Sequence, residues 1–568
     1  MRPSVIYRKT LFFLFLLLTA CLGQPRLGRR TSTPPPTPSP TVTPIPRLPT
    51  VNPTEPAPTP VPASSQALWI DVSVPEGLQE RLQVAEPVRK ARTANEATLH
   101  LGVVHAGEGT ATWVYTLVTP FPTTMDGIQI ADLRSTWQGK TNEVFGGKPL
   151  LMAASTLAAI ESLWGAAAPG AVLVVEREQL LDSAWGTRPS WALIPFEELG
   201  PRWKVIRVDG VSPLDRDFDL SAYPLTVRFG LREHADPGLV VLPEGNRDPH
   251  KLTTLVMTGV TALVRAIGAK MEKMGMDYPG EDIKAWLRDA DFTHVSNEVS
   301  FALTCPPANA NQYSLMFCSK PEYLDLLEYV GVDIIELTGN HLMDFRVDSL
   351  PYTLDLYRQH HMSFYGGGEN LIEARQPLKI EHNGNKIALL GCNPAGPPLD
   401  WATEVRPGTA DCEDYGWIKE EIQLLKKEGY LPVVTLQYSE VYVMKPTEWQ
   451  QRDFRALSEA GAVIISGSQA HFPQGFAFDE DHLIHYGLGN LFFDQMFMPE
   501  DKGTPVFAPD LPLPGTRLEF IDRHFFYDNH YVGTELLTAI LEDYSRPRPM
   551  TEKERQVFLR EAFRASGW

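Results

Sequence analysis

Short apolar runs separated by amphipathic segments predict mixed α/β structure over most of the chain. In the first half, the runs at residues 99–104 and 171–175 are typical of buried strands, and residues 153–164 carry the apolar spacing of a helix. A further strand-like run at residues 114–122 leads into a short amphipathic segment. We expect these elements to form an α/β domain over residues 67–247.

The second half repeats this alternation more regularly. Strand-like runs are expected at residues 255–263, 332–337, 386–390, 431–436 and 463–465. Helical segments are expected between them at residues 279–290, 321–329 and 419–428. Alternation of this kind is typical of a sheet with helices on its faces, so we expect a second α/β domain over residues 248–530.

The C-terminal segment predicts two helices, at residues 533–543 and 551–565, separated by an Arg-Pro-Arg-Pro sequence. Thr551 and Glu554 have the spacing of a capping box at the start of the second helix. We therefore expect residues 531–568 to form a helical extension.

The first 66 residues follow neither pattern. Basic residues precede an uninterrupted apolar run at residues 11–18, which is too short to span a membrane but suits a signal peptide. Small residues then lead into Cys21, which resembles the bacterial lipoprotein processing site, where the cysteine is acylated. The alternative is an ordinary cleaved signal with a chance cysteine. We expect a signal peptide at residues 1–20 and a lipid on Cys21.

Residues 31–63 are dominated by Pro, Thr and Ser, a composition that favours extended conformations over a packed core. We interpret residues 21–66 as a lipidated stalk. This places the globular part at the extracytoplasmic face of a bacterial envelope, with the membrane contacted through the lipid anchor.

The net charge of the chain bears on which classes of molecule it can bind. The chain has 568 residues, 43% of them hydrophobic, and a formal net charge of −19. An acidic surface disfavours nonspecific binding to nucleic acid, so no nucleic-acid partner is expected.

The cysteine count fits an exported protein once Cys21 is assigned to the lipid. Four cysteines remain, and pairing neighbours in sequence, Cys305 with Cys318 and Cys392 with Cys412, is the simplest of three connectivities. A thiolate metal site is the alternative, but the spacings contain no close CxxC pair, which favours disulfides.

Polar clusters follow several predicted strands of the second region, where α/β folds place their sites. The residues of these clusters that could ligate a metal or transfer a proton are, cluster by cluster, Glu298; Asn340, His341 and Asp344; Gln437 and Glu440; Gln469 and His471; and Asn490. An amide oxygen beside an imidazole, as in Asn340-His341, can ligate a cation or donate a proton to an oxyanion. Together with Glu298 and His471, this set of oxygen and nitrogen ligands suits Mn, Fe or Zn in hydrolysis.

The order of these clusters resembles the CapA-type poly-γ-glutamate capsule synthesis proteins. The resemblance covers about half the chain and is carried by Gly339-Asn340-His341 with Asp344, by Leu488-Gly489-Asn490, and by Gly-rich residues 366–370. It implies a calcineurin-like metallophosphoesterase fold, a four-layer α/β/β/α sandwich. It also implies a role in making or attaching an extracellular polymer, with the capsule machinery as partner.

The first region resembles periplasmic substrate-binding proteins more weakly, through the Trp137-Gln138-Gly139 turn and residues 220–225. A structural or partner-binding α/β domain is the alternative, since no ligand signature is present.

Several positions depart from the capsule-family pattern. Val260 stands where the family has a metal-binding acid, and Ser296-Asn297-Glu298 retains the acid of another element but alters its amide. Gln437 and Gln469 each stand where the family has a histidine. Neutral amides bind cations far more weakly than carboxylates or imidazoles, so a full dinuclear site is not expected.

Two hypotheses follow. In the first, a mononuclear metal site or a metal-free acid/base pair survives among Glu298, Asn340, His341, Glu440 and His471. His341 then protonates a leaving group, and Glu440 or Glu298 positions a nucleophilic water. The protein is then a reduced phosphoesterase-like hydrolase that holds one divalent metal or none.

In this first hypothesis Gln437, Gln469, Asn490 and Asp344 contact the substrate or support the ligands. In the second, catalysis is lost and the degenerate cleft binds a polymer, a glycan or a partner protein.

Overall fold

The computed structural model describes residues 66–86, 88–105, 110–233, 238–494, 506–508 and 511–568. The predicted signal peptide and Cys21 lie outside these residues, as does all of the stalk except residue 66. The described residues belong to one compact unit, Val61–Trp568. Within this part of the chain, no helix has both the length and the apolar character needed to cross a membrane.

A nine-stranded mixed sheet organises the first region, in the order β3-β1-β4-β12-β5-β9-β7-β8 with β10 paired to β5. The strands and helices of the whole region, including the separate pairs β6 with β11 and β2 with β13, are β1 (Ala67–Ile70), α1 (Glu76–Arg81), β2 (Gln83–Val84), β3 (Arg89–Lys90), β4 (Leu99–Val103), β5 (Ala111–Pro120), β6 (Gly127–Ile128), α2 (Ile130–Trp137), β7 (Leu150–Met152), α3 (Ala154–Trp164), β8 (Val172–Val174), α4 (Arg177–Gly186), β9 (Trp191–Pro195), β10 (Trp203–Val205), β11 (Arg207–Val208), β12 (Thr226–Leu231) and β13 (Val240–Val241). The strands predicted at 99–104 and 171–175 and the helix predicted at 153–164 are present as β4, β8 and α3. The predicted burial of 171–175 is wrong, because β8 lies at the edge of the sheet and Leu173 and Val174 are exposed.

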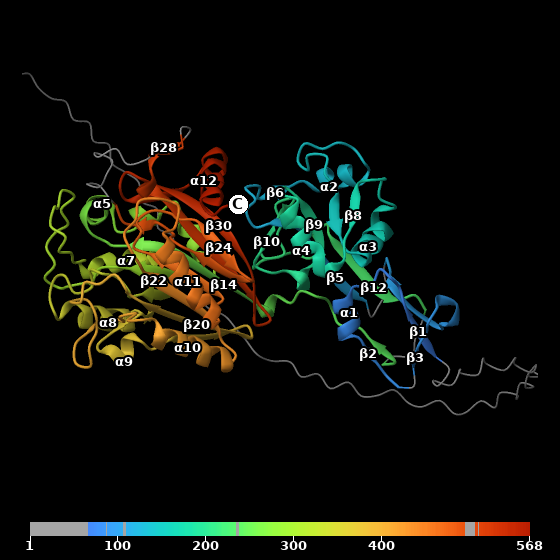
Figure 1. Ribbon diagram of the computed structural model, residues 1–568, viewed down its shortest axis with the longest axis horizontal. Helices are drawn as coiled ribbons and strands as arrows, with labels where there is room; N and C mark the ends of the chain where they lie inside the picture. Colours follow the sequence, from blue (N-terminus) through green and yellow to red (C-terminus); the bar gives the residue numbers. More distant parts are fainter. Residues whose placement is uncertain (1–65, 87, 106–109, 234–237, 495–505, 509–510) are drawn as a thin grey trace, which may run out of the picture. The chain divides into compact units, whose positions relative to one another are not determined.

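Two further sheets follow (Figure 1). One has eight strands in the order β17-β16-β15-β14-β29-β30-β31, with β26 also paired to β14, and the other has six in the order β19-β20-β22-β23-β25-β24. The elements are β14 (Leu252–Thr261), α5 (Arg265–Met274), α6 (Lys284–Arg288), β15 (Phe292–Asn297), α7 (Leu324–Val330), β16 (Ile334–Glu336), α8 (Ser349–Gln359), β17 (Ser363–Tyr365), β18 (Gly367–Gly368), α9 (Leu371–Ala374), β19 (Leu378–His382), β20 (Asn385–Cys392), β21 (Gly408–Thr409), α10 (Gly416–Lys427), β22 (Leu431–Gln437), α11 (Glu448–Ala460), β23 (Ile464–Ser468), β24 (Phe476–Asp479), β25 (His482–His485), β26 (Asn490–Phe492), β27 (Val506–Ala508), β28 (Leu511–Pro514), β29 (Leu518–Tyr527), β30 (His530–Glu542), β31 (Arg546–Pro549) and α12 (Glu552–Ala565).

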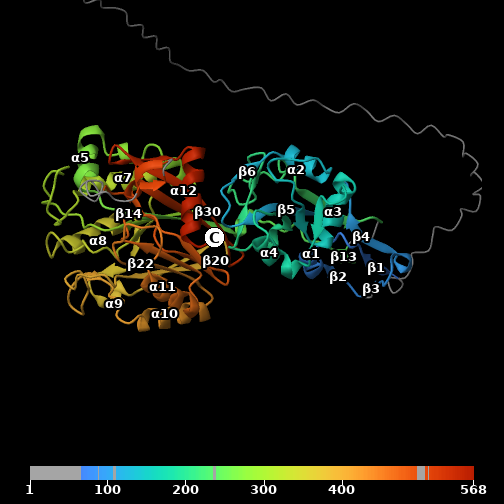
Figure 2. The ribbon, with the colours of Figure 1, turned by 45° about the horizontal axis from the view of Figure 1, so that its top comes forward.

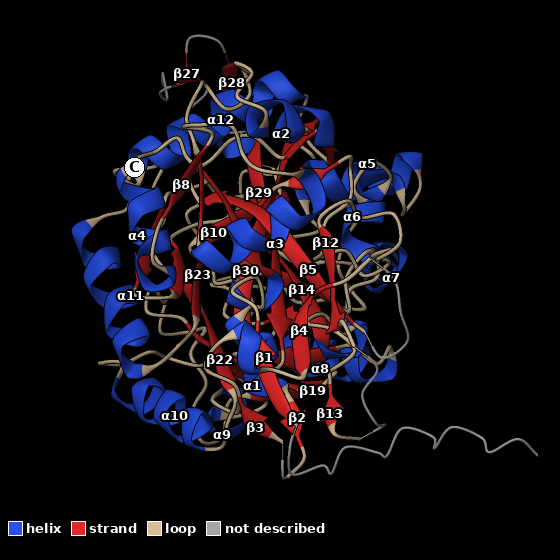
Figure 3. Ribbon diagram, turned by 90° about the vertical axis from the view of Figure 1, so that its right-hand side faces the viewer, coloured by secondary structure: helices blue, strands red, loops and turns tan. Residues whose placement is uncertain are grey.

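These two sheets pack face to face. Met257 of β14, Val433 of β22 and Ile464 of β23 are buried in one apolar cluster between them. A second cluster joins the eight-stranded sheet to α5, α7 and α8, and a third joins the six-stranded sheet to α10 and α11. Figure 2 shows α10 and α11 (orange) beside β22, and Figure 3 shows helices around an interior of strands. The predicted four-layer α/β/β/α sandwich is therefore confirmed.

The parallel strands bring their carboxyl ends to common edges. Strands β14, β15, β16 and β17 are mutually parallel, as are β20, β22, β23 and β25. This arrangement brings together polar residues from distant parts of the sequence, namely those that follow β15, β16, β22 and β23. The predicted strand ends led us to expect such a cluster.

The predicted C-terminal extension is wrong in its first half. Of residues 533–543, expected to be a helix, all but the last lie in β30, which pairs with β29 from His530 to Ile540. The β-branched residues Val532, Thr534 and Ile540 suit this pleated, buried position, so tertiary pairing overrides the helical spacing. The second helix is confirmed as α12, with the predicted capping box between Thr551 and Glu554.

Both predicted disulfides are confirmed. Cys305 bonds to Cys318 and Cys392 to Cys412, closing loops with sequence separations of 13 and 20 residues.

The helix predicted at 279–290 is shorter than expected. In that range the chain forms a 3₁₀ turn, Tyr278–Gly280, and then the short helix α6, Lys284–Arg288.

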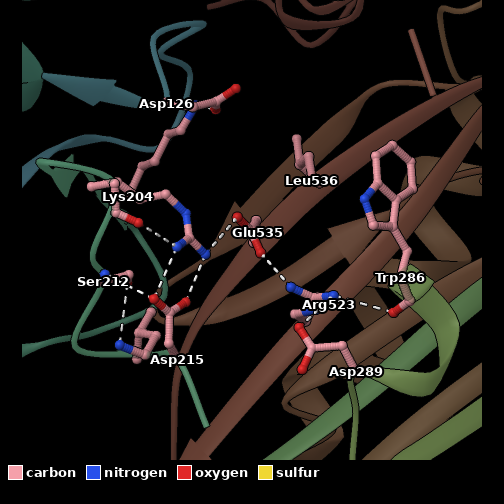
Figure 4. A network of polar contacts seen from close by, with 12 residues as sticks. Asp126, Lys204, Ser212, Asp215, Trp286, Asp289, Arg523, Glu535 and Leu536 are labelled. Carbon is pink, nitrogen blue, oxygen red and sulfur yellow. Dashed lines mark hydrogen bonds and ion pairs between the residues drawn. The ribbon is translucent and has the colours of Figure 1, made fainter. Parts of the chain in front are cut away.

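A polar network joins the first region to the eight-stranded sheet (Figure 4). Arg207 of β11 pairs with Asp215 at 2.7 Å and lies 3.6 Å from Glu535 of β30. Glu535 accepts a 3.0 Å hydrogen bond from Arg523 of β29, which also donates to the backbone oxygen of Trp286. These contacts help to make residues 61–568 one compact unit.

Candidate functional site

The candidate site lies where four parallel strands end. Glu298 follows β15, Asn340 follows β16, Gln437 is the last residue of β22, and Gln469 follows β23. The chain reaches Asn340 through Gly339, where a side-chain Cβ would lie only 2.5 Å from the Cα of Glu298. Glycine is therefore required for the close approach that sets Asn340 beside Glu298.

The side-chain amide of Gln437 lies among the oxygens of this group. Its nitrogen donates to Glu298 Oε1 at 2.5 Å and to Asn340 Oδ1 at 3.2 Å, and it also contacts Gln469 Oε1. The Gln437 oxygen accepts a 2.7 Å hydrogen bond from Ser468, which fixes the orientation of the amide. A neutral N–H donor thus faces the three oxygens that converge at the strand ends.

His341 forms a separate pair with Asp344. Its Nδ1 lies 2.7 Å from Asp344 Oδ2, which also accepts a hydrogen bond from the backbone nitrogen of Phe317 at 3.0 Å. Burial lowers the pKa of His341, but the hydrogen bond to Asp344 and the charge of Glu298 outweigh it and raise that pKa above its ordinary value. The ring centroid of His341 also lies 4.9 Å from that of Phe317, which fixes the orientation of the ring. The raised pKa favours the protonated form of His341.

His471 is held by a different partner. Its Nδ1 lies 2.9 Å from the oxygen of Asn490, whose nitrogen donates to the backbone oxygen of Thr516 at 3.0 Å. His471 has a φ of 51°, and its ring lies 5.0 Å from that of Phe493. Asn490 therefore fixes the orientation of the His471 ring.

Glu440 does not join the other predicted residues. It is exposed and takes its hydrogen bond from Tyr442, two residues on. The structure therefore places it against Tyr442 and not against Glu298, which gives no support to its expected role in positioning water.

Two acidic residues escaped the sequence reasoning. Asp400, 1% exposed, accepts a 2.9 Å hydrogen bond from the backbone nitrogen of Met343; burial, together with the charge of Asp344, raises its pKa to about 7. Glu336 is buried within β16, and burial raises its pKa to about 6 against the opposing hydrogen bond from Thr338.

Asp400 lies in a Pro- and Gly-rich loop with no strand ending nearby in sequence, so nothing local marked it. Glu336 could have been found from the sequence, because it is an acidic residue within the otherwise apolar end of the predicted strand 332–337.

Arg265 is the third residue that sequence reasoning missed. It begins α5, three residues beyond the end of β14, has a φ of 48°, and is 6% exposed. Its guanidinium lies 4.7 Å from the ring centroid of Phe317 and 5.7 Å from that of Phe493. An arginine in the left-handed region shortly after a strand end is a local irregularity of the kind that gathers at functional sites.

The donor set does not fit the metal centre that the family resemblance implies. Among the described residues, no group of three or more His, Cys, Asp or Glu side chains is arranged to hold a metal. Val260 is buried in an apolar cluster with Val299 and Phe317, where no ligand is offered. In the described part of the chain, Glu298 is the one carboxylate in contact with the Gln437 amide, and His341 and His471 bond through Nδ1 to Asp344 and Asn490 instead of to this group. The predicted ligand set is therefore not assembled.

Comparison with known proteins finds similarity to capsule synthesis proteins over the second region. The family model "Bacterial capsule synthesis protein PGA_cap" matches residues 254–495. The chain is 26% identical over 262 residues to the capsule biosynthesis protein CapA of Bacillus anthracis, covering 45% of this chain and 63% of that protein. It is 28% identical over 175 residues to the PGA biosynthesis protein CapA of Bacillus subtilis, covering 31% of this chain and 46% of the relative. The chain thus spans less than two thirds of these relatives.

Solved structures show only a distant likeness. The NAD nucleotidase of Haemophilus influenzae has a TM-score of 0.29 at 10% identity, covering 55% of this chain and 56% of that chain. An ABC-type phosphate transport receptor from Vibrio cholerae has a TM-score of 0.22 at 15% identity, covering 25% of this chain and 70% of that chain. At these scores the fold assignment rests on the sheet order and layers of the chain itself.

Proposed function

Because residues 254–495 match the family model for the bacterial capsule synthesis protein PGA_cap, we propose that this protein takes part in making or attaching an extracellular polymer. We propose further that the strand-end site binds the polymer and does not hydrolyse it. The protein acts at the extracytoplasmic face of the envelope, tethered through Cys21. Similarity to two capsule proteins supports the first part, and the geometry of Gln437 supports the second.

The observation that carries the proposal is the position of the Gln437 amide. A metal-assisted hydrolase uses carboxylate and imidazole ligands to hold a cation that activates water or polarises an oxygen. Here the oxygens of Glu298 and Asn340 instead accept hydrogen bonds from an uncharged nitrogen. An amide nitrogen donates and does not ligate, so these oxygens are already occupied without a metal.

The residues that remain suit binding. The pKa of His341 is raised, and its side chain is 20% exposed. Its hydrogen bond to Asp344 uses only Nδ1. Its Nε2 is therefore the nitrogen left to meet a ligand. Arg265 adds a fixed positive charge close by, so this part of the acidic protein carries the cations that an acidic polymer requires.

The proposal is tested with the purified full chain, a γ-linked glutamate oligomer and a generic phosphodiester. We expect the oligomer to bind in calorimetry and to remain intact by mass spectrometry after incubation with Mn²⁺ or Zn²⁺. The phosphodiester should also remain unhydrolysed. Release of shortened oligomer, or phosphodiester cleavage that is lost in His341→Ala, would show a hydrolase and overturn the binding assignment.

A matched control separates the site from the rest of the surface. His360 forms an exposed pair with Glu328 at 2.7 Å, the same distance as between His341 and Asp344, but lies on the helix side of the domain after α8. We expect His341→Ala to weaken oligomer binding and His360→Ala to leave it unchanged. Equal effects of the two substitutions would contradict binding at the strand ends.

A further inference from the structure

A polar cavity of about 130 Å³ lies in the first region, apart from the strand-end site. Its wall is formed by the end of α2, the loop between α2 and β7, and the loop between α3 and β8. Two lysines and two threonines line it, together with glycines, and none of the lining residues is acidic. The chain as a whole has 70 acidic residues against 51 lysines and arginines. This cavity therefore has a positive wall on an acidic protein, which favours a negatively charged ligand.

The two lysines of the cavity, Lys140 and Lys148, have no acidic partner in the described part of the chain. Lys148 donates to the backbone oxygen of Thr187 at 2.8 Å, which holds its ammonium group in place. A lysine ammonium has three N–H groups, so two remain for a ligand. Lys140 is exposed, and its side chain makes no hydrogen bond or ion pair with another described residue. Both positive charges are therefore available to a bound anion.

Thr136 adds a buried hydroxyl to the wall of the cavity. The residue is 7% exposed, and its Oγ1 has no hydrogen-bond partner in the described structure. A threonine within a helix commonly donates to the carbonyl one turn earlier, which here belongs to Asp132. That carbonyl instead accepts from the side-chain nitrogen of Asn142 at 3.5 Å. Buried polar groups are nearly always hydrogen-bonded, so the Thr136 hydroxyl is suited to donate to a ligand oxygen.

Glycines bring the two loops together and supply further donors. A Cβ on Gly139 would lie 2.8 Å from that of Ala168, so only glycine allows this close approach of the loops. Gly147 and Gly170 have φ values of 70° and 80°. Their backbone N–H groups, and that of Thr141, make no hydrogen bond with another described residue. Glycine-containing loops with free N–H groups beside a lysine are typical of oxyanion sites.

We propose that this cavity binds a tetrahedral oxyanion, a phosphate or sulfate group, between Lys140, Lys148 and Thr136. At about 30 Å³ per water molecule, its volume has room for roughly four waters, and so for a group of four or five heavy atoms. Lysines act as point charges, and the donors come from three segments, whereas a planar carboxylate is matched best by the fork of an arginine. No arginine lines the cavity. The inference concerns the first region and does not rest on the function proposed for the strand-end site.

The test is calorimetry of the full chain in a phosphate-free buffer of low ionic strength, with inorganic phosphate, sulfate, glycerol phosphate and acetate as probes. We expect saturable binding of the tetrahedral anions and much weaker binding of acetate. Lys140→Gln and Lys148→Gln should each weaken phosphate binding about 10-fold or more, the range for losing a charge-assisted hydrogen bond. Thr136→Val keeps the side-chain shape without the hydroxyl and should weaken it about 3–10-fold. Lys427→Gln, at an exposed position of α10, removes the same charge and should have no effect.

The probes also separate the two sources of such a group. Binding of glycerol phosphate at least as tight as that of phosphate supports a group carried on a larger molecule, and binding of the inorganic ions alone supports a free ion. The inference is overturned if no probe binds saturably, if acetate binds as tightly as phosphate, or if Lys427→Gln weakens binding as much as Lys140→Gln. Thermal unfolding checks the folding of each variant. Because Lys140 is exposed, Lys140→Gln tests the site even if Thr136→Val does not fold.

Discussion

Asp400 gives a prediction whose magnitude follows from the structure. The carboxyl group is 1% exposed, and it accepts a hydrogen bond from the backbone nitrogen of Met343. Burial raises its pKa from 3.8 to about 7. Between these two values the folded protein keeps the proton that the unfolded chain has released, so the free energy of unfolding falls as the pH rises through this window.

The size of the effect follows from the pKa difference. At about 1.36 kcal/mol per pKa unit, the difference corresponds to at most ~4 kcal/mol, and we expect about 2–4 kcal/mol after relaxation of the loop. Asp400→Asn keeps the oxygen that accepts from Met343 and removes the ionisation. The variant should match wild type near pH 4 and be more stable by this amount near pH 8.

The assay is urea unfolding of wild type and variant at several pH values between 4 and 8. Asp348→Asn serves as the control, because Asp348 is exposed and should change the free energy of unfolding by no more than about 0.5 kcal/mol. A variant that is no more stable than wild type near pH 8 would refute the reasoning, since it would mean that burial does not penalise the charged form of Asp400.

Three further predictions concern other parts of the chain. Asp126 contacts Arg555 at 2.6 Å. Burial opposes its ionisation, but the hydrogen bonds and charges of Arg555 and Lys204 together outweigh burial and lower the pKa to about 2, so the stabilisation is present above pH 3.8 and lost on acidification. Because the carboxylate is 38% exposed, Asp126→Asn should cost only about 1 kcal/mol at pH 7 and nothing below pH 2 in urea unfolding; a larger loss at low pH would be inconsistent with this. Replacing Cys392 and Cys412 together by Ser should lower the free energy of unfolding by about 3 kcal/mol, since their sequence separation is 20, and an unchanged unfolding midpoint would exclude that contribution. Cys21→Ser should abolish labelling by radioactive palmitate and release the protein from membranes in fractionation; continued labelling would exclude lipidation at this residue.

The sequence was informative where local pattern and tertiary position agree. Regular alternation of apolar runs predicted β14, β16, β20, β22 and β23, since buried parallel strands are continuous apolar runs. Their ends then located Glu298 and Asn340 in one sheet and Gln437 and Gln469 in the other, because parallel strands bring the residues at their carboxyl ends to the same edge of each sheet.

Sequence reasoning failed where tertiary contacts decide. The run 533–543 has helical spacing, yet it pairs with β29, and no local signal reports a partner strand. Asp400 and Arg265 become site residues through loop geometry and aromatic packing, which no spacing rule captures. The departures at Gln437 and Gln469 were visible in sequence, but their consequence, an amide donor facing the ligand oxygens, required the structure.

We propose that the Gln437 amide takes the place of a cation at the strand ends, and metal binding tests this most directly. The full chain is dialysed against Mn²⁺ and Zn²⁺ and its metal content is measured, alongside Gln437→His, which restores an imidazole between Glu298 and Asn340. We expect wild type to retain far less than one metal ion per chain and to show no saturable binding in calorimetry, with a gain of binding in the variant. Retention of one ion per wild-type chain, removed by Glu298→Gln, would contradict the account.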